Sequence, residues 1–138
     1  MSYESKVYIG MRKELETPKG IKMVMFFELA SFNLSVMGSE KVNGKEFYDC
    51  FTTPIDFNLY EIPNADEDKY GIDDPFWHTD RYGEHIKYTS VDTVLHWLEQ
   101  SETAKTYRRA KTFLTFLRSL QENRDMYDGE LIAIHYGF

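Results

Sequence analysis

The spacing of apolar residues changes along this chain of 138 residues, and the change limits the folds it can adopt. Near 7–11 and 23–27 apolar residues recur at every second position, which is typical of β-strands. From 91 to 120 they recur every three or four residues, as on one face of a helix. Alternation returns at 131–136. We therefore predict one α+β domain over 1–138: a predominantly antiparallel sheet, two helices of the C-terminal half packed on one face, and a C-terminal strand.

Turn residues mark where the expected strands of the first half reverse. Pro18 and Gly20, in the stretch ETPKG, predict the turn of a hairpin. The returning strand is apolar on both faces as far as Glu28, so we expect it to be covered on both sides. Residues 29–38 could continue the strand, bend, or form a short helix. The stretch VNGK predicts a second hairpin turn, and EFYDCFT and PIDFNLYEI after it are β-like.

Two helices are expected in the second half, near 90–100 and 103–123. Thr89 or Ser90 can cap the first of them, and Tyr107 begins the apolar stripe of the second. The short stretch HIKY before the first helix could be a strand. The residues that we expect these helices to bury are Val94, Leu95, Leu98, Phe113, Leu114 and Leu117.

Negative charge is concentrated between Asp49 and Glu84. This stretch has ten acidic residues against Lys69 and Arg81, a charge of −8, whereas the rest of the chain has 13 acidic and 14 basic residues and is nearly neutral at +1. Residues 63–84 show no apolar period, contain Pro and Gly, and are too many for an ordinary connection. We therefore expect a long acidic loop at about 63–84, from which any long-range attraction of a partner originates.

The stretch DDPFWHTDRYGEH, which begins at residue 73, is the first candidate site. Carboxylates on an extended surface anchored by aromatic residues can imitate a row of phosphates, and opposite charges speed an encounter. We expect a protein partner with a basic surface, such as a nucleic-acid-binding host or defence protein. The simpler interpretation is that the aromatic side chains fix the loop while the acidic ones stay hydrated. The residues assigned to this partner-binding surface are Asp73, Asp74, Phe76, Trp77, Asp80 and Glu84.

His78, Asp80 and His85 could instead hold a divalent metal ion with one coordination position open. Their spacings of two and five residues match no established metal motif. We therefore expect neither a metal nor any other cofactor.

A cluster of basic residues on the second expected helix is the alternative site. Arginine binds phosphate through two parallel hydrogen bonds, and tyrosine can stack on a base. Lys105, Tyr107, Arg108 and Arg109 would suit a small ligand or a nucleotide phosphate, in a protein that could then be an enzyme. A solvated basic helix face is the simpler explanation. Direct binding to duplex nucleic acid is not expected, because the net charge of −7 repels a polyanion.

The motifs of common enzymes are missing from the sequence. It has no GxGxxG or GxxxxGK[ST] loop for nucleotide phosphates, no HExxH for zinc and no GxSxG for a hydrolase. Catalysis is therefore not favoured, and no catalytic residue can be named. Cys50, between aromatic residues, is expected to be a small buried apolar group. Nothing resembles a membrane helix or a secretory signal, so we expect a cytoplasmic location.

The stretches KVYIGMRKE, MVMFFELASFNL, YGEHIKYTSVDTVLHWLEQ and ELIAIHYGF resemble small uncharacterised proteins carried by phages and prophages of gut and Gram-positive bacteria. The resemblance covers most of the chain, but it lies in structural features, namely a capped helix and a terminal strand. It brings no catalytic residues. It implies an accessory protein that acts inside a bacterial host cell, where many such proteins bind and inhibit a host component.

Overall fold

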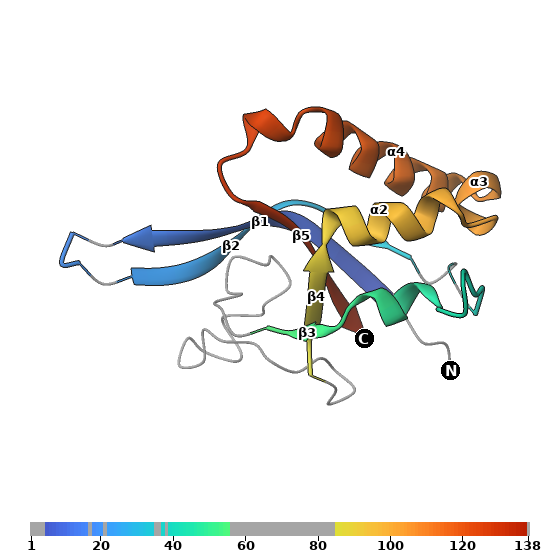
Figure 1. The fold of residues 1–138 in the computed structure, drawn as a ribbon, viewed down its shortest axis with the longest axis horizontal. Coiled ribbons are helices and arrows are strands. Elements are labelled where there is room, and N and C mark those ends of the chain that lie inside the picture. The colour runs from blue at the N-terminus through green and yellow to red at the C-terminus, as the bar shows by residue number, and fades with distance from the viewer. Residues whose placement is uncertain are drawn as a thin grey trace.

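The computed structural model describes residues 5–16, 18–20, 22–34, 37, 39–55 and 85–137. Their strands form one antiparallel sheet with the order β2-β1-β5-β4-β3, covered on one face by helices (Figure 1). This is the predicted α+β arrangement. The strands are β1 (Ser5–Glu16), β2 (Lys22–Asn33), β3 (Thr53–Pro54), β4 (Lys87–Ser90) and β5 (Glu130–Gly137), and the helices are η2 (Phe47–Cys50), α2 (Val91–Glu99), α3 (Thr103–Thr106), α4 (Arg108–Glu122) and η3 (Arg124–Met126).

The strands β1 and β2 form a long ribbon whose register changes once. Ile9 pairs with Ala30, but the next residue, Gly10, pairs with Glu28. Leu29 is therefore an extra residue on β2, a β-bulge. An extra residue exchanges the faces to which odd and even positions point.

The exchange of faces explains why the sequence pattern weakens after Glu28. Before the bulge, Phe26 is buried on the sheet face away from the helices. After it, Phe32 lies on the helix side, with its ring centroid 4.9 Å from that of Phe113 in α4. Of the alternatives for 29–38, a strand is correct as far as Asn33.

Buried apolar residues cover both faces of the sheet. β5 shows this most clearly, because Leu131 and Ala133 belong to the cluster under the helices and Ile132 and Ile134 to the cluster on the opposite face. All six helix residues predicted to be buried are buried, none more than 7% exposed. The second cluster consists of Tyr8, Phe26, Ile55, Ile86, Ile132, Ile134 and Tyr136.

The segment after the VNGK turn is not the strand that its sequence predicts. The turn itself is confirmed, since Val42 and Lys45 pair across it and Gly44 has a φ of +82°. The following EFYDCFT forms the 3-10 helix η2 instead. Phe47 and Cys50, three residues apart, are both buried, and three is the repeat of a 3-10 helix. Of the further predicted strand PIDFNLYEI only the first two residues are described, Pro54 ending β3.

The second predicted helix is also divided. α3 ends at Thr106, and Tyr107 is extended, with φ −91° and ψ 128°, before α4 begins. At the end of α3 the Tyr107 amide still donates to the Thr103 carbonyl at 3.0 Å, and the Thr106 hydroxyl donates to the Glu102 carbonyl at 3.0 Å. Tyr107 is 57% exposed rather than part of the apolar stripe.

No helix in the described ranges is long and apolar enough to cross a membrane.

Candidate functional site

The acidic segment, defined from here on as residues 56–84, joins two neighbouring strands at one edge of the sheet. Thr53 of β3 pairs with Tyr88 of β4, and the Ile55 amide donates to the Ile86 carbonyl at 3.0 Å. Antiparallel neighbours are ordinarily connected by about 2–5 residues. The chain uses 29 here, from 56 to 84. The hydrogen bond between Ile55 and Ile86 thus holds the two ends of the segment side by side.

The charge of the chain divides at the same two points. Residues 56–84 contain nine acidic residues against two basic ones, a charge of −7, whereas the described residues contain 13 acidic and 14 basic ones, a charge of +1. The segment is thus a charged insertion in a balanced body. Its expected partner-binding residues, Asp73, Asp74, Phe76, Trp77, Asp80 and Glu84, lie outside the described residues, so their role remains a prediction.

Of the three residues of the candidate metal site, the structure describes only His85. His85 is exposed at the second end of the acidic segment, with its Nε2 3.4 Å from the Ile55 carbonyl oxygen. His78 and Asp80 lie outside the described residues. Within the described part of the chain, no three His, Cys, Asp or Glu side chains are grouped so that they could hold a metal ion.

The basic surface, defined as Lys105, Tyr107, Arg108, Arg109 and Lys111, surrounds the junction of α3 and α4. All five side chains are exposed. Tyr107 is the N-cap of α4 and gives no side-chain hydrogen bond to it, and the first backbone bond runs from the Lys111 amide to the Tyr107 carbonyl at 2.9 Å. The amides of 108–110 consequently have no acceptor among the described residues.

The electrostatics of this junction favour an anion. Arg108 and Arg109 stand at the positive end of the α4 dipole, and the first turn holds no acidic residue. Lys105 lies 3.7 Å from a Glu102 carboxylate oxygen, whereas Arg108, Arg109 and Lys111 form no ion pair with any described residue. The structure thus places all four residues of the predicted phosphate site at one junction, where their side chains are exposed.

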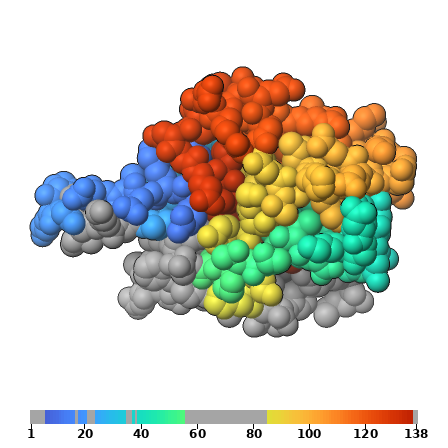
Figure 2. Space-filling model, in the orientation of Figure 1, coloured from blue at the N-terminus to red at the C-terminus, as the bar shows by residue number. Residues whose placement is uncertain are grey.

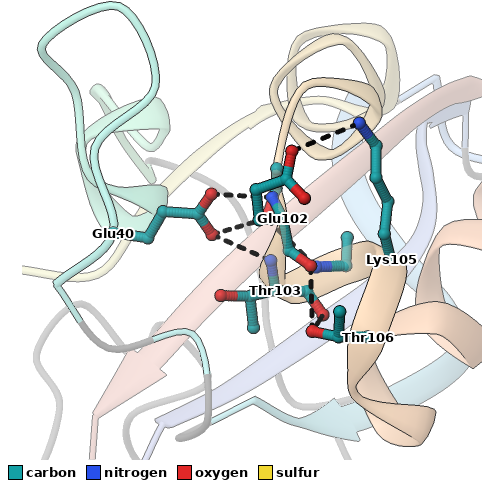
Figure 3. A network of polar contacts seen from close by, with 7 residues as sticks. Glu40, Glu102, Thr103, Lys105 and Thr106 are labelled. Carbon is teal, nitrogen blue, oxygen red and sulfur yellow. Dashed lines mark hydrogen bonds and ion pairs between the residues drawn. The ribbon is translucent and has the colours of Figure 1, made fainter.

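The start of α3, by contrast, is occupied by the chain's own carboxylate (Figure 3). Glu40 accepts hydrogen bonds from the Ser101 hydroxyl at 2.7 Å, the Glu102 amide at 2.8 Å and the Thr103 amide at 3.2 Å. Burial alone would raise the pKa of Glu40, but the hydrogen bonds from Ser101 and Thr103 outweigh it and hold that pKa below its ordinary value. This helix start is therefore closed to a ligand.

Replacing Glu40 with glutamine should lower the free energy of unfolding by about 1–2 kcal/mol at neutral pH. Because the pKa of Glu40 is lowered by folding, the charged form stabilises the fold above the ordinary pKa near 4.5, and this contribution is lost as the pH falls through the folded value. Urea denaturation of both proteins from pH 7 to pH 3 should show the difference shrinking. Glu122→Gln, at an exposed position, is the control. A difference that stays constant with pH would contradict the explanation.

Cys50 is buried, as its sequence context predicts, and is no candidate nucleophile. Burial raises its pKa to about 11, although Lys45 acts in the opposite direction. At neutral pH the side chain is a thiol, and the thiolate is the reactive form.

Comparison with known proteins adds no assignment. No family model, no curated protein and no solved structure matches this chain. The resemblance to phage and prophage proteins therefore stays a prediction from sequence, and a function has to be argued from the two surfaces themselves.

Proposed function

We propose that this chain is a small binding protein, encoded by a phage or prophage and acting in the bacterial cytoplasm, that uses its acidic segment against a basic surface of a host or defence protein. The observation that carries the proposal is where the segment is inserted. Nearly all the net charge of the molecule lies between β3 and β4, two strands that a short turn could join. A long charged insertion contributes nothing that strand pairing requires, so we assign it to recognition.

The frame around the insertion supports this role. β4 pairs with β5, which is central in the sheet, and α2 follows β4 directly with Ser90 as its N-cap. The Ser90 hydroxyl accepts from the Thr93 amide at 3.2 Å. Binding residues carried by a connection need such a rigid support at its ends. A nearly neutral body also leaves the field of the segment uncancelled, which favours fast encounter with a cationic partner.

Changing Asp73, Asp74 and Asp80 together to Asn should slow association with the partner by about tenfold at low salt and flatten its salt dependence. Stability should hardly change, since hydrated surface charges contribute little to it. The partner is first recovered by affinity capture with the parent chain from a bacterial lysate, then purified. Association rates are measured by stopped flow at several ionic strengths.

The matched control removes the same charge elsewhere. Glu16, Glu122 and Asp125 are exposed on the described body, and their joint change to Gln, Gln and Asn also raises the net charge by three. This control should retain most of the parent's association rate. If the acidic-segment variant associates as fast as the parent at low salt, the segment is not the binding surface.

An anion-binding role is the second candidate, favoured by the free amides of 108–110 and the exposed Arg108 and Arg109 beside them. A phosphate or nucleotide would accept hydrogen bonds from both, and Tyr107 could stack on a base. Titration with inorganic phosphate and with a nucleotide, followed by amide chemical shifts, tests it. Saturable shifts at 107–111 that Arg108→Ala and Arg109→Ala abolish would support this role over the first. Uniform small shifts would exclude it.

A further inference from the structure

The two edges of the described sheet differ in their capacity to pair with another strand. β3 at one edge has two residues, and one of them, Pro54, has no amide hydrogen to donate. β2 at the other edge has 12 residues and pairs only with β1 among the described strands. The β1–β2 ribbon projects from the body, away from α3 (Figures 1 and 2). A long edge strand of this kind offers backbone groups to a further strand.

The bulge at Leu29 limits the regular part of this edge to the seven residues Lys22–Glu28, KMVMFFE. The five inner residues are uncharged and apolar, with the high strand propensity of Val and Phe. The two ends carry opposite charges. Natural edge strands are commonly protected from pairing by inward-pointing charges or by proline. The five inner residues of this edge include neither.

We propose that β2 pairs antiparallel with β2 of a second copy of this chain, about a two-fold axis at Met25, so that two sheets become one. In an antiparallel pair centred on one residue, positions equally far before and after the centre face each other. Lys22 of each copy then stands opposite Glu28 of the other, and Val24 opposite Phe26. The pairing uses the whole regular edge and produces two ion pairs. Only a second copy necessarily carries a Glu opposite Lys22 and a Lys opposite Glu28. We therefore assign this edge to a second copy rather than to an unrelated strand.

Glu28 gives an independent reason to expect a cation from outside. Its Oε1 is buried and accepts no hydrogen bond within the described molecule. Its pKa is raised because burial outweighs the attraction of Lys6. A buried carboxylate oxygen without a donor is costly, and a lysine of the second copy opposite this residue would remove that cost.

The geometry also predicts how large the assembly is. A two-fold contact uses the same surface on both copies, so pairing through β2 consumes that edge in each. The opposite edge of the described sheet is the short β3 strand with Pro54. The assembly therefore closes at two copies rather than continuing as a filament.

Sedimentation equilibrium of the full chain tests the proposal, with a concentration-dependent monomer–dimer equilibrium as the expected result. Lys22→Glu alone, or Glu28→Lys alone, places like charges opposite each other twice, and each should weaken dimerisation by about tenfold. The double variant exchanges the two charges and should restore the parent's dimer. An equimolar mixture of the two single variants should also form dimers, because every facing pair is then Glu against Lys.

Controls and a second measurement make the result decisive. Lys41→Glu and Glu122→Lys change the same charges at exposed positions outside β2 and should leave dimerisation unchanged. Independently of charge, Met25→Cys places two thiols on the two-fold axis, so mild oxidation should give a covalent dimer, whereas Ser31→Cys beyond the bulge should not. A parent that remains monomeric at every concentration, or single variants that dimerise like the parent, would overturn the proposal. So would a Ser31→Cys crosslink as efficient as that of Met25→Cys.

Discussion

Replacing Phe47 with alanine is expected to lower the free energy of unfolding by about 3–5 kcal/mol, through lost burial and the cavity left behind. Phe47 is 0% exposed. Its ring centroid lies 5.5 Å from that of Trp97 in α2 and 6.2 Å from that of Phe113 in α4, both edge to face. One side chain thus links η2 to both long helices. Urea denaturation followed by circular dichroism measures the loss.

The same substitution at Phe116 is the matched control. Phe116 is only partly buried, and its ring meets Phe32 at 5.4 Å on the margin of the same cluster. Phe116→Ala should therefore cost clearly less than Phe47→Ala. Equal losses, or a loss at Phe47 below about 1 kcal/mol, would show that Phe47 does not hold η2 against the helices.

Replacing Gly10 with alanine is expected to cost about 3 kcal/mol, as overpacking against fixed groups does. A Cβ atom at this position would collide with the Phe27 carbonyl oxygen and lie 2.8 Å from the Phe26 ring. Gly10 is the residue of β1 opposite Glu28, next to the bulge, where the two backbones approach closely. Thermal and urea denaturation of the variant would report the loss.

A second substitution separates the two collisions. Phe26→Leu replaces the ring with a shorter branched side chain but leaves the Phe27 carbonyl in place, so adding it to Gly10→Ala should recover little stability. The single Phe26→Leu variant measures the loss due to the ring alone, and comparison of all four proteins gives the coupling. Substantial recovery in the double variant would mean that the ring, not the backbone, excludes a side chain at residue 10.

The fold class was predictable because α2, α4 and β5 each have one consistent spacing of apolar residues. In α2 and α4 the residues Val94, Leu98, Phe113 and Leu117 all lie on the buried side that their spacing predicts. In β5 the two alternating sets face opposite clusters. In these elements the local conformational preference of the residues agrees with their burial in the fold. Such agreement allows secondary structure to be predicted from sequence.

The errors occur where a tertiary contact or a local competitor decides. EFYDCFT has the aromatic composition of a strand, but the Glu46 and Asp49 capping pair closes a 3-10 turn, which buries Phe47 and Cys50 together. The bulge at Leu29 reverses an alternation without any residue type that marks it. The break at Tyr107 lacks Gly or Pro, the usual signals of a helix end.

For the candidate sites, the sequence predicted where charged residues cluster but not the backbone geometry around them. Lys105, Arg108 and Arg109 are close together in sequence and exposed at one junction, but the break that leaves the α4 amides without acceptors among the described residues could not be foreseen from them. The insertion of the acidic segment between paired strands was equally hidden, because β3 is too short to be recognised. Glu28 was missed as a site residue, since the sequence does not show that its Oε1 is buried without a hydrogen-bond donor among the described residues.

The pairing of β1 with β5 has a consequence for when the molecule can fold. Val7 near one end of the described chain pairs with His135 near the other, and these two strands occupy the middle of the sheet. Contacts so distant along the chain must close a large loop, and the entropy of closure slows their formation. The β1–β2 ribbon can form early from local contacts, but the other edge of β1 stays open until β5 pairs with it. Until then the open edge of β1 can pair with other strands, so a partly folded chain is exposed to misassembly at this position.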